Sequence, residues 1–260
     1  MDVISQMKKH QWTIGGIMIA VVLILLEEES IPGVWAIPLA IIAAILGGLY
    51  FLRVGKLAEQ RSKKFKNLAE QMGMEFSVED EWDIGASLSA FDLFWEADIT
   101  NVLSGDSEQL GYGEAFEVTV LECRNVIQTA DNSRKTIVQT VICFHSPQLS
   151  LPDFSMRPEE WHHKLRSKLG YQDIDFESHP TAVEFSKKYL LRGKDEQTIR
   201  ALFTDAVLTF FAAHPDKVCV EGSDDQLIWY QPGKIIEPED IPAFMKEGFE
   251  VFRVFARKQN

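Results

Sequence analysis

The sequence predicts an α+β protein in which an N-terminal two-helix transmembrane hairpin precedes a soluble domain, built mainly on an antiparallel sheet with flanking helices. Two long apolar stretches occupy the first fifth of its 260 residues. Beyond them, strand-like segments come in clusters separated by helical segments, without the βαβ rhythm of a parallel sheet. These observations divide the chain into a hairpin over residues 1–54 and a cytosolic α+β domain over residues 55–260.

Both apolar stretches are candidates for membrane-spanning helices. Trp12–Leu26 has fifteen residues, fewer than the roughly twenty that cross a bilayer core, although flanking lysines can snorkel to extend it. Val34–Leu52 has nineteen residues without a charge, and Trp35 and Tyr50 lie near its ends, as in an aromatic belt. The second stretch is the stronger candidate.

The loop between the two stretches argues against a cleaved signal peptide. It begins with three glutamates, offers no small-x-small cleavage site, and leads directly into the second stretch. Lys8 and Lys9 precede the first stretch and six bases between Arg53 and Lys66 follow the second, whereas the loop has none. The positive-inside rule therefore predicts a multi-pass protein with both termini in the cytoplasm.

Charge and cysteine content restrict the partners and the compartment. The net charge is −13, and eight of the 26 bases but only five of the 39 acids precede Asn67. The rest carries 18 bases and 34 acids, a net charge of −16, which disfavours nucleic acid as a partner. Cys123, Cys143 and Cys219 show no CxxC spacing, and their odd number favours reduced thiols in the cytosol.

The first elements of the soluble domain follow the second apolar stretch directly. Val54–Met72 has the periodicity of a helix, and Gly73 supplies its C-terminal stop. Its bases either contact anionic lipid headgroups or only set the topology. Three short segments come next: Glu75–Val78, Phe91–Trp95 and the strand candidate Ile99–Leu103, which the turn Ser104–Asp106 closes.

The clearest element is a β-hairpin. Ala115–Val126 and Lys135–Phe144 are rich in Val, Ile, Thr and Cys, and the polar stretch Thr129–Arg134 connects them. Helices and short strands alternate after it. The predicted elements are a helix Pro158–Leu169, a helical stretch Asp195–Ala213 broken near Thr204, strands Val218–Val220 and Leu227–Tyr230, and a final helix Pro238–Arg257 with an apolar stripe.

Three side-chain groups are candidates for chemistry. Glu159 and His162 have the ExxH spacing of a di-iron ligand pair, but one copy is too few, so a surface helix is favoured. Cys143 and His145 lie two apart on a strand, the minimum for a cysteine nucleophile, although a buried cysteine beside an edge histidine is favoured. The third group is Asp173, Asp175 and Glu177, which alternate with apolar residues along the chain. Three carboxylates on one face could bind a hard cation, but charges on an exposed edge strand are the favoured interpretation.

The commonest catalytic, phosphate-binding and zinc-binding motifs are absent from the sequence. The catalytic residues are therefore unknown, and no cofactor and no metal site is predicted.

Five segments carry a resemblance to a known family: Asn101–Gly105, Gln139–Val141, Leu151–Glu159, Asp173–Phe176 and Tyr189–Gly193. In their order the chain resembles a family of bacterial membrane proteins of unknown function, with two N-terminal spans and a cytosolic domain. The resemblance implies a bacterial inner-membrane setting and supplies no catalytic residues. It also implies that Leu151–Phe154 and Arg157–Glu159 are packing and turn signatures.

The sequence favours a membrane-anchored binding or scaffolding module whose acidic domain engages a protein partner beside the lipid bilayer. A membrane-surface enzyme of unrecognised type and an accessory subunit of a membrane complex remain alternatives. Self-association into a homo-oligomer stays open. The pairs Gly15–Gly16 and Gly47–Gly48 allow the two helices of the hairpin to approach each other closely.

Overall fold

The computed structural model describes residues 33–128, 134–160 and 170–256, and the chain divides into two compact units, residues 1–64 and 65–260. The first predicted span, Trp12–Leu26, lies outside the described residues. Whether this stretch is a span or a signal peptide is therefore not tested by the structure. The two-helix hairpin and the domain boundary at residue 54 therefore stay predictions.

Helix α2 (Gly33–Met72) is a single helix of 40 residues that contains the second predicted span and the predicted helix after it. In the part of the chain that the structure describes, it is the one helix long and apolar enough to cross a membrane, by length and composition. The side chains of Leu46, Leu49 and Leu52 are each more than half exposed. Gly73 ends the helix with a φ of +69°, as the sequence predicts.

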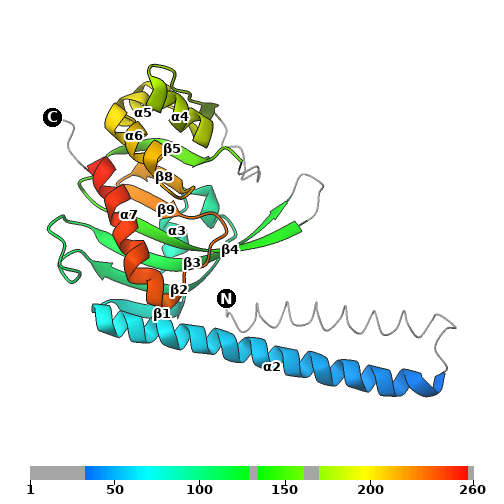
Figure 1. The fold of residues 1–260 in the computed structure, drawn as a ribbon. Helices are drawn as coiled ribbons and strands as arrows, with labels where there is room; N and C mark the ends of the chain where they lie inside the picture. The colour runs from blue at the N-terminus through cyan, green and yellow to red at the C-terminus, as the bar shows by residue number, and fades with distance from the viewer. Residues whose placement is uncertain (1–32, 129–133, 161–169, 257–260) are drawn as a thin grey trace. The chain divides into compact units, whose positions relative to one another are not determined.

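The second unit is built on one antiparallel sheet, so the predicted α+β class with mainly antiparallel pairing is confirmed (Figure 1). Among the described residues the sheet has nine strands in the order β1-β2-β3-β4-β9-β8-β5-β7-β6. The strands are β1 (Glu75–Glu79), β2 (Asp98–Asp106), β3 (Glu117–Gln128), β4 (Arg134–His145), β5 (Leu151–Pro158), β6 (Gln172–Asp173), β7 (Tyr189–Gly193), β8 (Cys219–Asp224) and β9 (Gln226–Tyr230).

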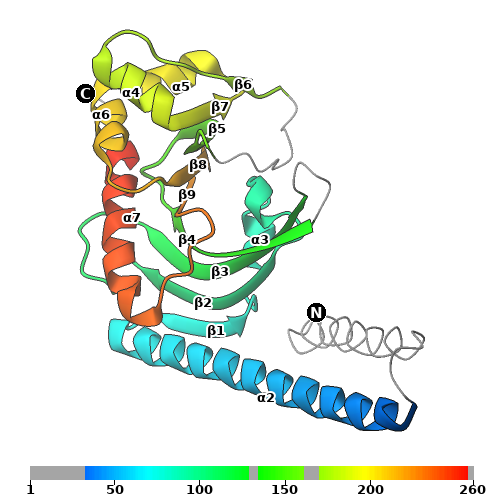
Figure 2. The same ribbon diagram turned by 45° about the vertical axis from the view of Figure 1, so that its right-hand side comes forward.

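Helices cover the two faces of this sheet unequally. Alternation along β3 sends Val118 and Val120 into a large core and Leu121 and Cys123 into a smaller one on the opposite face. The large core includes residues of α4 (Pro180–Lys188), α5 (Glu196–Leu202), α6 (Asp205–Ala213) and α7 (Ile241–Ala256), which follows the 3₁₀ helix η2 (Pro238–Asp240). The short helices α3 (Ile84–Ser87) and η1 (Asp92–Phe94) cover the smaller core (Figure 2).

The final predicted helix packs on the sheet by its apolar stripe. All six stripe residues are buried: Ile241, Phe244, Met245, Gly248, Phe252 and Phe255. A Cβ on Gly248 would stand 2.8 Å from Ile142 Cδ1 and 3.3 Å from Trp229 Cε3, so the absence of a side chain lets α7 approach β4 and β9 closely.

Several predicted elements are confirmed. The β3–β4 hairpin has a continuous register from Glu117↔His145 to Gln128↔Arg134. The helical stretch Asp195–Ala213 is broken near Thr204 into α5 and α6, and β8 and β9 pair as a hairpin.

Two local predictions are wrong. Ser104–Asp106 extends β2 rather than closing it, because these residues continue the ladder with β3. The short segment Phe91–Trp95, for which no type of element was predicted, contains the 3₁₀ helix η1. Pro158 ends strand β5 opposite Tyr189 instead of starting a helix. Residues 161–169 of that predicted helix lie outside the described residues.

Candidate functional site

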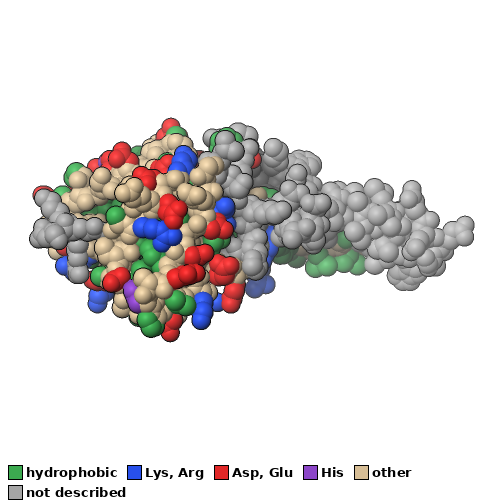
Figure 3. Space-filling view, turned by 90° about the horizontal axis from the view of Figure 1, so that it is seen from above, with side chains coloured by type: hydrophobic (Ala, Val, Ile, Leu, Met, Phe, Trp, Pro, Cys, Tyr) green, Lys and Arg blue, Asp and Glu red, His purple; other side chains and the backbone are tan. Residues whose placement is uncertain are grey.

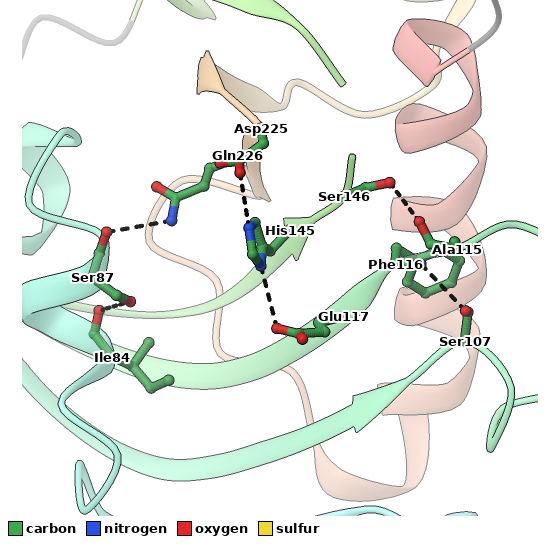
Figure 4. A network of polar contacts seen from close by, with 10 residues as sticks. All are labelled: Ile84, Ser87, Ser107, Ala115, Phe116, Glu117, His145, Ser146, Asp225 and Gln226. Atoms are coloured by element: carbon green, nitrogen blue, oxygen red, sulfur yellow. Dashed lines mark hydrogen bonds and ion pairs between the residues drawn. The ribbon is translucent and has the colours of Figure 1, made fainter. Parts of the chain in front are cut away.

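The best-organised polar cluster on the described surface centres on His145, the last residue of β4 (Figure 4). Glu117 opens β3 directly opposite His145, and Asp225 lies in the turn between β8 and β9. The imidazole Nδ1 is 3.3 Å from Glu117 Oε2, and Nε2 is 2.9 Å from Asp225 Oδ2. Three segments far apart in sequence therefore meet at one ring.

The geometry favours a positively charged imidazole. An imidazole that donates to carboxylates from both nitrogens carries both protons. The hydrogen bond with Glu117 raises the pKa of His145 above its ordinary value, Asp225 adds to the rise, and partial burial opposes it. Because all three side chains are largely exposed, each pair contributes at most about 1 kcal/mol to stability.

Other polar contacts near His145 fix the adjoining loops. Gln226 Nε2 donates to the carbonyl oxygen of Ser87 at 3.3 Å, which connects β9 to α3. The hydroxyl of Ser146 donates to the carbonyl oxygen of Ala115 at 2.5 Å. These contacts, drawn in Figure 4, connect neighbouring loops and elements and therefore have a structural role.

Cys143 and His145 do not form a nucleophile pair. The Cys143 side chain is buried in the smaller core, and burial raises its thiol pKa well above the ordinary value. Both nitrogens of His145 are engaged by carboxylates, so neither is placed to accept a thiol proton. Burial also raises the pKa of Cys123, to about 12.

The predicted alternation at Asp173 is confirmed. Ile174 and Phe176 are buried, whereas Asp173, Asp175 and Glu177 are exposed. Strand β6 is the edge of the sheet, and Asp173 Oδ1 lies 2.7 Å from Arg192 Nε of β7. This geometry favours the edge-strand interpretation over a cation site.

In the described ranges, no group of three or more His, Cys, Asp and Glu side chains is arranged to hold a metal ion. Glu159 is exposed just after β5, and His162 lies outside those ranges. The ExxH hypothesis therefore stays a prediction.

A cavity of about 370 Å³ opens beside the end of β5. Four of its charged and polar groups are engaged in pairs: Lys217 Nζ is 2.5 Å from Glu160 Oε2, and Gln231 Nε2 donates to Asp216 Oδ2 at 3.0 Å. Its lining combines these four residues with Pro158, Pro232 and Lys234.

Residues Glu75–Asp98, named here the acidic-aromatic segment, form a surface that the sequence analysis missed. The segment contains eight acidic residues and no Lys or Arg. Trp82 and Trp95 are 38% and 59% exposed, although tryptophan side chains are usually largely buried. The run of acids without a base was visible in the sequence, but only the structure places both indoles at the surface.

The acidic-aromatic segment is held firmly to the sheet. Asp80 accepts hydrogen bonds from the backbone N–H groups of Ile84 and Gly85 at 2.7 and 2.8 Å. Asn125 Nδ2 donates to the carbonyl oxygen of Leu93 at 2.6 Å. Figure 3 shows that acidic side chains are spread over another face of the folded unit as well, with basic side chains between them.

No family model and no curated protein matches the chain. Among solved structures, the chain is similar to the crystal structure of the mycobacterial trehalose monomycolate transport factor A, TtfA. The TM-score is 0.49 at 13% identity, over 75% of this chain and 92% of that chain. Similarity at this level carries no argument about function.

Proposed function

We propose that the chain is a membrane-anchored binding module that holds an acidic folded unit at the cytoplasmic face of a bacterial inner membrane. The observation that carries this proposal is the dual character of α2. The helix exposes apolar side chains from Ile41 to Leu52, yet Phe65, Leu68 and Ala69 near its end are buried in the large core. One helix thus supplies both a surface suited to lipid and a part of the folded unit.

The proposed topology includes a second span. Trp12–Leu26 and Val34–Leu52 cross the membrane as a hairpin, and the bases on both sides of the hairpin keep the two termini in the cytoplasm. A reporter fused after Asn260 is expected to be active in the cytoplasm. Activity confined to the outside would overturn this topology.

The acidic-aromatic segment is the proposed docking surface. Exposed aromatic side chains are enriched at the centres of protein interfaces, and Trp82 and Trp95 are of this kind. The eight acids of the segment favour a partner with a basic, partly apolar surface, because complementary charge steers encounter and excludes wrong partners.

A membrane-surface enzyme remains the alternative, and an accessory subunit of a complex differs mainly in stoichiometry. The geometry of Cys143 and His145 disfavours thiolate chemistry, as described above. A copurifying metal or small molecule that is lost in an Asp175→Ala variant would favour the enzyme instead.

Copurification of full-length protein from its native membrane tests the docking surface. Photo-crosslinking residues placed at Trp82 or Trp95 are expected to capture a partner that a Trp82→Ala/Trp95→Ala variant no longer retains. Ile235→Ala is the matched control, since Ile235 is an exposed apolar residue outside the segment. Equal retention by all three proteins would refute the proposed docking surface.

A further inference from the structure

The hairpin β3–β4 extends beyond the rest of the sheet. Strand β2 pairs with β3 no further than Arg124, which lies opposite Asp98. Strand β9 pairs with β4 only from Val141 to His145. Residues Arg124–Gln128 and Arg134–Val138 therefore form a two-stranded projection, named here the β3–β4 ribbon, which both ribbon views show (Figures 1 and 2).

The ribbon is a basic exception in an acidic unit. Arg124, Arg134 and Lys135 stand in its two strands and Asp131 in the connection between them, so residues 124–138 carry a net charge of +2, whereas the chain after residue 66 carries a net charge of −16. Lys135 is exposed and forms no ion pair with another described residue. Val126 adds an apolar side chain that is 58% exposed. A basic projection with an exposed apolar residue has the character of a docking element.

The ribbon and the acidic-aromatic segment lie side by side at one end of the sheet. The hydrogen bond from Asn125 to the carbonyl oxygen of Leu93 joins them directly, and Arg124 Nε lies 4.0 Å from Asp98 Oδ2. Trp95 is two residues from Leu93 in sequence, and Val126 is next to Asn125. This end of the unit therefore presents a basic surface and an acidic surface next to each other.

We propose that this end pairs with a second copy of the chain, so that the ribbon of each copy docks on the acidic-aromatic segment of the other. The inference rests on the proposed function, since it names the partner of the same docking surface. Adjacent patches of opposite charge are self-complementary under two-fold symmetry, because each patch meets its opposite once. Anchoring in one membrane gives all copies one orientation and raises their effective concentration.

An anionic lipid surface is a less suitable binding partner for the ribbon than a second copy of the chain. Anionic headgroups attract three bases, but they repel the eight acids that lie next to them. A second copy satisfies both charges at once. The exposed Trp82, Trp95 and Val126 also gain burial only against a protein surface with apolar side chains.

The size of the effect follows from the number of charge pairs. An exposed ion pair contributes about threefold to an association constant. Arg124 already lies 4.0 Å from Asp98 of its own chain, so Lys135 is the base that supplies a pair across the interface. Two-fold symmetry doubles that pair, so its removal lowers the association constant by roughly tenfold, and inversion adds like-charge repulsion to that loss.

The test uses two differently tagged full-length copies, coexpressed and solubilised from their membrane at low salt. One variant inverts two bases of the ribbon (Arg124→Glu/Lys135→Glu), and the other inverts two exposed acids of the segment (Glu81→Lys/Glu96→Lys). Each variant is expected to weaken self-copurification, and a mixture of the two is expected to recover part of the loss, since the introduced glutamates of one copy then face the introduced lysines of the other. Lys187→Glu/Lys246→Glu, at exposed positions on α4 and α7, is the control and should copurify like the wild type.

Failure to copurify at any salt concentration, or copurification unaffected by either inversion, would overturn self-pairing. Loss in each variant without restoration in the mixture would overturn it too. If ribbon inversion instead only released a monomeric protein from anionic vesicles, a lipid surface would be the occupant. A different partner retained by the wild type and lost with Trp82→Ala/Trp95→Ala would leave the proposed function standing while refuting self-pairing.

Discussion

A charge placed in the middle of the apolar part of α2 tests the anchoring directly. Gly33–Leu52 is twenty residues long, and at 1.5 Å per residue it spans about 30 Å, the thickness of a bilayer core. Ile42 lies near its centre and is more than half exposed. On insertion scales, replacing Ile by Arg at the centre of a span costs about 3–4 kcal/mol, which lowers the insertion equilibrium by about 150- to 900-fold.

The matched control is Leu57→Arg on the same helix. Leu57 is exposed to a similar degree, but it lies five residues beyond Leu52, among residues that already include Arg53 and Lys56. An added base at that position faces water or headgroups and is expected to change insertion by less than about 0.5 kcal/mol.

Resistance to alkaline extraction is the assay, in a chain that begins at Glu27, so that α2 is its one long apolar stretch. The starting chain and Leu57→Arg are expected in the membrane fraction, and Ile42→Arg in the supernatant. If Ile42→Arg stayed in the membrane fraction like Leu57→Arg, the exposed apolar surface of α2 would have another purpose, and the anchoring argument would be wrong.

Three further predictions concern the folded unit. Burial raises the pKa of the three cysteine thiols and shields them from solvent, so thiol reagents should modify them only after denaturation. Because the pKa of His145 is raised in the folded state, its stabilisation is complete below pH about 6.5 and disappears as the pH rises through the folded-state pKa. His145→Gln should therefore lower the unfolding midpoint at pH 6 but not at pH 9. A Cβ on Gly222 would stand 2.4 Å from Phe154 Cε1, so Gly222→Ala should destabilise by about 1–3 kcal/mol, and a calorimetric double-mutant cycle with Phe154→Leu should recover part of that loss.

Periodic patterns were the reliable guide to local structure. The apolar stripe of α7, the alternation around Asp173 and the hairpin β3–β4 each depend on residues close in sequence, and the structure confirms all three. The break between α5 and α6 near Thr204 was predictable for the same reason.

The wrong predictions fall where long-range pairing overrides local preference. Ser104–Asp106 reads as a turn, but the ladder with β3 continues through these residues. Pro158 suits the first turn of a helix, yet it also suits the end of a strand, and pairing of β5 with β7 decides between them.

The His145 cluster could be predicted only in part. The register of a predicted hairpin can bring Glu117 opposite His145, but Asp225 is 80 residues away and no local pattern connects it to the ring. The acidic-aromatic segment is the converse case, since its charge is evident from sequence and its exposed indoles are not. Exposure of a particular tryptophan depends on how the chain around it packs.

The order of charges along the chain bears on the proposed self-pairing. The bases from Arg53 to Lys66 directly follow the apolar stretch, so they suit the negative surface potential of a cytoplasmic leaflet. The acidic excess follows them, and in the proposed topology the same potential repels it, which favours a folded unit held away from the lipid surface. The acidic surface nearest to the ribbon is the acidic-aromatic segment of its own chain, where Arg124 already lies 4.0 Å from Asp98. Lys135, which forms no ion pair with another described residue, is the base that the segment of a neighbouring copy can meet. Added salt should therefore weaken pairing of the folded units while leaving the apolar anchor in place, since only the first depends on exposed charge.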